Sequence, residues 1–191
     1  FLSRMSHELR TPMNAVVGLT DLTGMMEGVP EDVRDNLDKL RASAHYMLDL
    51  INDILDMSRI ESGKMLLKNE KIPTEDFLNG INSICYAQAA ARGVDYECIV
   101  DPVLDDYYMG DAMKLQQVLI NILSNAIKFT KEGGKVTLSA ALRRKTKNDA
   151  VLRFIVNDTG IGISEEFIPH IFEPFSQEST GTTAPYGGSG L

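Results

Sequence analysis

Two long runs of helically spaced apolar residues occupy the first third of the chain, and they constrain the fold more than any other feature. In the first run, residues 1–26, apolar side chains recur every three or four positions until Gly28 and Pro30 break the pattern. The second run covers residues 33–60, and Gly63 supplies a stop signal. The two runs predict an antiparallel hairpin of two long helices.

The apolar stripes on both predicted helices are too wide for a lone hairpin to bury. Two hairpins packed against each other would form a four-helix bundle with a shared core. The pattern therefore predicts a homodimer held together by this hairpin.

Beyond Gly63 the apolar pattern alternates between strand and helix periods. We predict strands at residues 65–67, 96–100, 136–142 and 151–157, and helices at residues 74–91, at 111–130 and from about Ser164 onward. Thr74 is expected to cap the first of these helices. The whole chain is thus predicted to be α+β, with one domain at residues 1–63 and another at residues 64–191.

Charge and cysteine content narrow the classes of function. A net charge of -8 argues against a surface for nucleic acid or anionic membrane. Cys85 and Cys98 form no CxxC or Cys/His cluster, so neither a disulfide framework nor a zinc site is indicated and a reducing cytoplasm fits. No apolar run approaches the roughly 20 residues that a bilayer requires, so we expect no direct membrane contact.

The predicted helix at residues 111–130 carries a polar stripe whose members follow at steps of three or four. They are Asp111, Lys114, Gln117, Asn121, Asn125 and Lys128. An ordinary solvated face is one explanation. A nucleotide site is the alternative, because asparagine is a poor helix former, its amide oxygen is a ligand for Mg²⁺, and lysine neutralises phosphate.

The stretch NDTGIGI at residues 157–163 follows a predicted strand. Its glycines stand where the backbone must turn tightly or approach a ligand. The spacing fits neither a dinucleotide fingerprint nor a P-loop. Asp158 at the strand end is a candidate acceptor for the adenine amino group, and a simple turn into a helix cap is the alternative.

The stretch SHELRTP at residues 6–12 places a histidine and a proline inside the first predicted helix. A lone histidine on a helix is most simply a solvated side chain, although an imidazole with a pKa of about 6.5 is mostly neutral and nucleophilic at cytoplasmic pH. Pro12 lacks an N–H and its ring would clash with the Glu8 carbonyl, so we expect the helix to loosen or bend beside His7.

Five stretches of the chain together resemble the signature of the sensor histidine kinases. They look like the H, N, G1, F and G2 boxes of that family, in the family's order: FLSRMSHELRTPMNAVVG, NILSNAIKFT, DTGIGI, IFEPF and GGSGL. The resemblance implies a dimerisation and histidine-phosphotransfer hairpin, followed by an α/β sandwich that binds ATP, as in gyrase, Hsp90 and MutL.

The resemblance also implies roles for individual residues of the hairpin. By similarity His7 is the phospho-acceptor, and Glu8 orients or deprotonates its imidazole. Thr11 lies one helical turn further along the same face, where bifunctional members of the family position water for dephosphorylating a partner.

In the second domain the resemblance implies a site for ATP and Mg²⁺. Asn125 would be the magnesium ligand, with Asn121 and Lys128 near the phosphates and ribose, while Asp158 would read adenine. The expected glycine contacts to the nucleotide are Gly160, Gly162, Gly187, Gly188 and Gly190. Phe172 and Phe175 match the F box, and residues 176–186 would form a lid.

We therefore expect a kinase that phosphorylates His7 and passes the phosphoryl group to an aspartate of a response regulator receiver domain. The receiver is expected in a separate protein or in a part of the chain outside this sequence. We also expect this sequence to be a fragment, because proteins of the family continue beyond both of its ends. It is expected to be the cytoplasmic portion of a sensor, for which a membrane anchor in an N-terminal segment is one alternative.

Three other classes remain open at the level of sequence. One is a phosphatase-dominant or non-catalytic ATP-binding module of the same fold. Another is an ATP-driven machine of the gyrase or Hsp90 kind, which has no need of an acceptor histidine in a hairpin. The last is a plain coiled-coil dimerisation protein, which would bind no nucleotide.

Overall fold

The computed structural model describes residues 2–173 and residue 176, with side chains from Glu8 onward. Within it the helical hairpin extends to Leu66 as one compact unit, and a second compact unit spans Leu67–Pro169. Each unit is described by itself.

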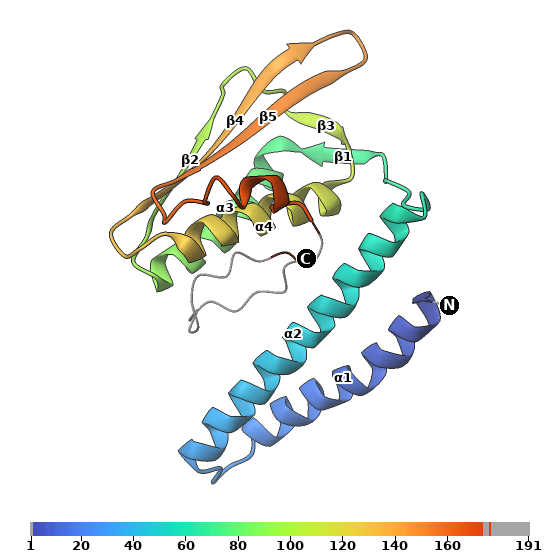
Figure 1. The fold of residues 1–191 in the computed structure, drawn as a ribbon, viewed down its shortest axis with the longest axis vertical. Coiled ribbons are helices and arrows are strands. Elements are labelled where there is room, and N and C mark those ends of the chain that lie inside the picture. The colour runs from blue at the N-terminus through green and yellow to red at the C-terminus, as the bar shows by residue number, and fades with distance from the viewer. Residues whose placement is uncertain (1, 174–175, 177–191) are drawn as a thin grey trace. The chain divides into compact units, whose positions relative to one another are not determined.

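The hairpin consists of α1 (Leu2–Gly24) and α2 (Glu31–Glu61), which lie side by side and antiparallel (Figure 1). The predicted pair of long helices is therefore confirmed. Gly28 adopts φ +78° in the link, a conformation that glycine tolerates best, and Pro30 occupies the N-cap position of α2. The helix α1 continues through Pro12.

Few hairpin side chains are buried within one copy of the chain. Among the described residues of the two helices, only Thr20, Ala44 and Leu55 are classed as buried. Between the helices, an Arg10 Nη2 group donates to Asn52 Oδ1 at 2.7 Å. A single hairpin thus has a thin core, as the width of its apolar stripes predicts.

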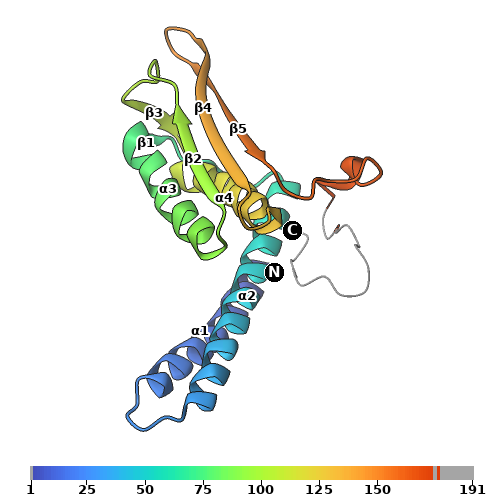
Figure 2. The same cartoon turned by 90° about the vertical axis from the view of Figure 1, so that its left-hand side faces the viewer.

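The second unit contains two sheets and two long helices. β1 (Glu70–Pro73) pairs antiparallel with β3 (Tyr107–Gly110). The larger sheet has the order β2-β4-β5, in which β2 (Asp95–Val100) is parallel to β4 (Lys135–Lys145), and β4 is antiparallel to β5 (Ala150–Asp158). The helices α3 (Thr74–Ala91) and α4 (Ala112–Phe129) cover one face of this sheet (Figure 2).

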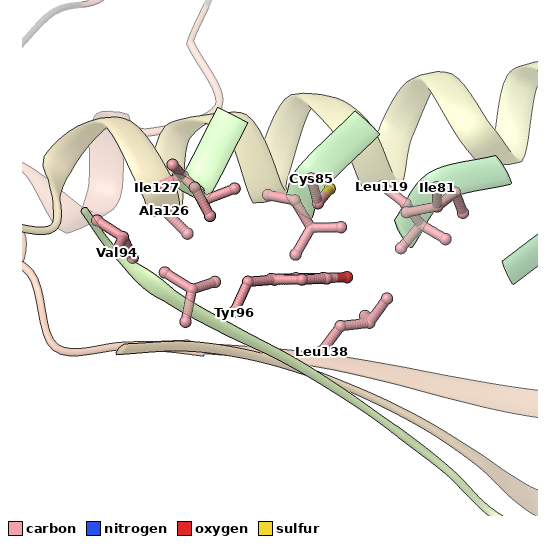
Figure 3. Close-up of a cluster of buried hydrophobic side chains, with 11 residues drawn as sticks. Ile81, Cys85, Val94, Tyr96, Leu119, Ala126, Ile127 and Leu138 are labelled. Atoms are coloured by element: carbon pink, nitrogen blue, oxygen red, sulfur yellow. The ribbon is translucent and has the colours of Figure 1, made fainter. Parts of the chain in front are cut away.

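The main core lies between this sheet face and the two helices (Figure 3). Alternate residues of the strands point inward, among them Tyr96, Val136 and Leu138, as the period of two in a strand requires. They meet Ile81 of α3 and Leu123 of α4, both fully buried. This core confirms the predicted α+β class and fixes α4 against the sheet.

Tyr96 is the large polar member of the core, and its hydroxyl donates to Asn82 Oδ1 at 2.9 Å. Its ring meets that of Tyr86 edge to face, with centroids 4.9 Å apart. Burial raises the pKa of Tyr96, and likewise the pKa of the Cys85 thiol, so both groups stay protonated at neutral pH.

Three local predictions were wrong. No strand forms at residues 65–67, where Leu66 is 91% exposed; the strand begins at Glu70 instead, and its partner β3 was missed. Thr74 is the first helical residue rather than the cap, and its Oγ1 donates to the Asp105 carbonyl at 2.6 Å. Among the described residues after Ser164, a 3₁₀ turn at Ile168–His170 stands in place of the predicted α-helix.

Within the part of the chain that the structure covers, none of the helices combines the length and apolar character that crossing a bilayer demands.

Candidate functional site

The first half of the polar stripe on α4, Asp111, Lys114 and Gln117, stabilises the helix itself. Asp111 is the N-cap: its Oδ1 accepts from the Lys114 N–H at 3.1 Å, and its Oδ2 accepts from the Lys68 N–H at 3.1 Å. These backbone bonds from Lys68 and Lys114 lower the pKa of the Asp111 carboxyl. Lys114 Nζ in turn donates to Gln117 Oε1 at 3.1 Å. This half of the stripe is therefore structural.

The second half of the stripe presents groups suited to a ligand. Asn121 and Asn125 are exposed and lie one helical turn apart, and Lys128 follows on the same side, half-buried. In the described part of the chain, neither asparagine side chain makes a hydrogen bond. Two free amide groups on the surface of one helix are thus available to a solute.

The turn after β5 carries Asp158, the predicted adenine reader. Asp158 pairs across the sheet with the buried Val136, so its side chain leaves the strand on the face that α3 and α4 cover. Its Oδ1 accepts from the Gly160 N–H at 2.9 Å. Its Oδ2 has no partner among the described residues, which leaves one carboxylate oxygen free to accept.

The glycines of this turn are needed for different reasons. A Cβ on Gly160 would lie 2.7 Å from the Phe129 carbonyl oxygen and 2.8 Å from Asp158 Oδ1, so the turn can pass α4 only without a side chain there. Gly162 has open space around it but adopts φ +72°. Gly160 is thus needed for packing within the chain and Gly162 for the shape of the turn, and both stay predicted contacts to the nucleotide.

The turn after β5 is bonded directly to the end of α4. The Ile161 N–H donates to the Phe129 carbonyl at 3.2 Å, which joins residues far apart in the sequence. Thr159 adds two bonds to the start of β4, since its Oγ1 accepts from the Lys135 N–H at 2.9 Å and its N–H donates to the Lys135 carbonyl at 3.0 Å. Asp158 and the polar stripe of α4 therefore belong to one rigid assembly.

Sequence reasoning missed the residues that build this assembly. Thr159 stood inside the DTG stretch without an assigned role. The buried Thr130 donates its Oγ1 to the Ala126 carbonyl at 2.7 Å and so ends α4. Gly134 is also required, because a Cβ would approach Thr130 Cγ2 to 2.5 Å. The sequence signals that could have pointed to these residues were a threonine directly after a predicted helix and the glycine pair in the following turn.

These groups fit an adenine nucleotide with Mg²⁺. A carboxylate oxygen is free at one end and two amides stand on the adjoining helix, beside a lysine. Within the described residues, no cluster of three or more His, Cys, Asp or Glu side chains suited to a metal is present. Mg²⁺ takes one or two protein ligands and completes its shell with phosphate oxygens and water.

The residues of the SHELRTP stretch lie on α1. His7, the predicted acceptor, is one turn before Thr11 along the helix, and Glu8 and Thr11 are both exposed. The side chain of His7 is outside the described part. His45 is exposed, and Nδ1 of His170 lies 2.9 Å from Glu173 Oε2.

The structure describes part of the expected F box and none of the GGSGL stretch that matches the G2 box. Phe172 is 94% exposed. The remaining predicted positions, Phe175, Gly187, Gly188, Gly190 and most of the lid at 176–186, lie outside the described residues.

Two sequence families match the chain. Residues 1–63 match the His Kinase A (phospho-acceptor) domain, and residues 110–191 match the histidine kinase-, DNA gyrase B- and HSP90-like ATPase. The matches cover the hairpin and the part of the second unit that contains α4 and the turn after β5.

Proteins similar to the chain over its whole length include sensor kinases, which is consistent with these two families. The chain is 38% identical over its whole length to the autoinducer 2 sensor kinase/phosphatase LuxQ of Vibrio vulnificus, of which it spans 22%. It is 39% identical to the sensor protein GacS of Pseudomonas syringae pv. syringae, of which it spans 21%. The full-length structure of ShkA in complex with AMPPNP matches 92% of the chain and 36% of ShkA, with a TM-score of 0.74 and 30% identity. The chain belongs to the sensor histidine kinases.

Proposed function

We propose that this chain is the catalytic core of a histidine kinase, which binds ATP with Mg²⁺ and transfers its γ-phosphoryl group to His7. The observation that carries the proposal is the bond from the Ile161 N–H to the Phe129 carbonyl, 3.2 Å long. Through it the turn with Asp158 and the helix with Asn125 form one site. The complex of the relative ShkA with an ATP analogue supports the same ligand class.

The groups gathered at this site each have a role toward the nucleotide. The unpartnered Oδ2 of Asp158 accepts a hydrogen bond from the adenine amino group, while the Gly160 N–H holds Oδ1 in place. Asn125 is the proposed Mg²⁺ ligand, and Asn121 and Lys128 contact the phosphates. Mg²⁺ supplies charge neutralisation for phosphoryl transfer, and positioning supplies most of the rest.

The phosphoryl transfer itself requires a neutral imidazole at His7. Its free ring nitrogen forms the new P–N bond as the bond from γ-phosphorus to the bridging oxygen breaks and ADP departs. Glu8 holds the proton on the other ring nitrogen, which keeps the attacking nitrogen unprotonated.

The phosphohistidine then serves a partner protein. An aspartate carboxylate of a response regulator receiver domain takes the phosphoryl group, so the P–N bond breaks and a P–O bond forms. Thr11, exposed and one turn along α1 from His7, holds a water for a second task, the removal of phosphate from that regulator. The name of LuxQ, a kinase/phosphatase, favours this second activity.

The core works as a homodimer in the cytoplasm, where ATP is available. The thin core of a single hairpin supports dimerisation, since pairing two hairpins buries stripes that one leaves open. Gly160, Gly162, Gly187, Gly188 and Gly190 are proposed contacts to the nucleotide. The domain limits, 1–63 for the hairpin and 64–191 for the ATP-binding domain, are proposed with them.

The adenine assignment is tested by measuring ATP binding calorimetrically with Mg²⁺ for Asp158→Asn. Asn keeps the bond to the Gly160 N–H but replaces one acceptor oxygen with a donor, so ATP affinity should fall by at least about tenfold. Asp149→Asn is the matched control, because Asp149 is exposed at the opposite end of β5. Equal ATP affinity in wild type and Asp158→Asn would contradict the assignment.

A further inference from the structure

The last turn of α4 is held by donors from three different segments. Helix ends leave carbonyl groups without partners inside the helix, and buried or functional ends need outside donors. Here Thr130 donates to the Ala126 carbonyl, and Ile161 donates to the Phe129 carbonyl at 3.2 Å. The third donor is Arg92, whose Nη2 donates to the Lys128 carbonyl at 2.9 Å.

Arg92 lies in the turn after α3, and backbone hydrogen bonds hold this turn in place. It is the C-cap residue of α3, and Gly93 follows with φ +64°. The Gly93 carbonyl accepts from the Gly133 N–H at 2.7 Å, and the Gly134 carbonyl accepts from the Asp95 N–H at 2.8 Å. These two hydrogen bonds join the turn after α3 to the turn after α4. The Arg92 guanidinium therefore extends from an ordered backbone toward the C-terminal end of α4.

The residue that Arg92 holds belongs to the proposed site. Lys128 is the last member of the polar stripe on α4, and its neighbour Phe129 bonds to the turn with Asp158 through Ile161. A cation at a helix C-terminus also opposes the partial negative charge of the exposed carbonyls. Arg92 thus acts on the end of α4 that links the phosphate-facing and adenine-facing parts of the site.

We propose that Arg92 is a positioning residue for nucleotide binding, which sets the last turn of α4 so that Lys128 and the turn after β5 face the ligand together. The inference rests on the proposed function, since it assigns a role toward the same ATP site. Arg92 is not expected to contact the nucleotide; it acts through the Lys128 carbonyl.

The exposure of Arg92 makes this role separable from folding. Hydrogen bonds and charges at exposed positions contribute little to global stability. Replacing Arg92 should therefore leave the fold intact while it loosens the helix end, and loss of ATP affinity should exceed any loss of thermal stability.

The test compares Arg92→Ala and Arg92→Lys with a control, Arg153→Ala. Lysine retains a donor and a positive charge, and Arg153 is an exposed arginine of β5 outside the site. The measurements are the Kd of ATP with Mg²⁺ by calorimetry, the KM for ATP and kcat of autophosphorylation, and the Tm without nucleotide.

For Arg92→Ala we expect a Kd and KM for ATP raised by about tenfold, equivalent to about 1.4 kcal/mol. The expected kcat stays within about twofold and Tm stays close to wild type. Arg92→Lys should recover most of the affinity, and Arg153→Ala should match wild type.

Two results would overturn the role of Arg92 alone: unchanged ATP affinity in Arg92→Ala, or a loss in Arg92→Lys as large as in Arg92→Ala. A drop in Tm that accounts for the loss of affinity would also overturn it, because the role would then be structural. If wild type and Arg153→Ala bind no ATP at all, the proposed function fails, and this inference fails with it.

Discussion

At the scale of single residues, the turn after β5 shows how a glycine required by packing can resemble one required by a ligand. Gly160 stands in the DTG stretch, and its side-chain position is filled by the Phe129 carbonyl and the Asp158 carboxylate. The proposed nucleotide site depends on it indirectly, because the same close approach lets Ile161 bond to Phe129.

Gly160→Ala should weaken both the fold and the site. The new Cβ would force apart Phe129 and Asp158, at a cost of about 1–3 kcal/mol in unfolding free energy, and ATP affinity should fall at least about tenfold as Asp158 is displaced. Urea unfolding and calorimetric titration with ATP measure the two effects.

Gly80→Ala is the matched control. A Cβ on Gly80 would approach only Gln116 Nε2, at 3.9 Å, and the position is inside α3. Alanine should therefore stabilise the protein by about 0.5–1 kcal/mol without altering ATP affinity. Wild-type unfolding free energy in Gly160→Ala would contradict the packing argument, and wild-type ATP affinity would contradict the link between Gly160 and the site.

At the scale of elements, α2 carries an apolar stripe that its own hairpin does not cover. Val33, Leu40, Met47 and Ile54 recur every seven residues and are 38%, 53%, 52% and 43% exposed. A seven-residue repeat of apolar side chains is the pattern by which helices pair in bundles. This stripe is the most direct candidate for the contact between two copies.

Leu40→Glu should weaken that contact. A charge at the centre of the stripe would have to lose water on association, so the dimer dissociation constant should rise by at least about tenfold. Analytical ultracentrifugation over a range of concentrations measures it. The matched control is Ala42→Glu, exposed on the other side of α2; identical dimerisation of the two variants would argue against the stripe.

The elements also differ in how far the sequence predicts them. The prediction for α4 was correct to within one residue at each end, because its apolar period is long and Asp111 and Thr130 mark its limits. β1 was placed wrongly because Ile72 is its only buried residue, and β1 forms through pairing with β3. Short strands of this kind depend on tertiary contacts that no local pattern contains.

At the scale of the whole molecule, the sequence identified the family and the second unit's candidate residues, but not how they meet. The hairpin, the α+β class and the polar stripe on α4 follow from the spacing of apolar and polar residues along the sequence. The bond between residues 129 and 161, and the donor from Arg92, are contacts between distant segments. The same holds for the bond from the Lys68 N–H to Asp111 Oδ2, which joins the first member of the stripe to a distant segment.

The proposed function requires that His7 receives the γ-phosphoryl group of ATP bound at this site. The most direct measurement incubates the protein with γ-labelled ATP and Mg²⁺ and follows the label on wild type, His7→Gln, Asn125→Asp and, as a matched control, the exposed His45→Gln. We expect a label stable in alkali and lost in acid on wild type and His45→Gln, and none on the other two variants. Persistence of the same label on His7→Gln, or its absence from a wild type that binds ATP, would contradict the account.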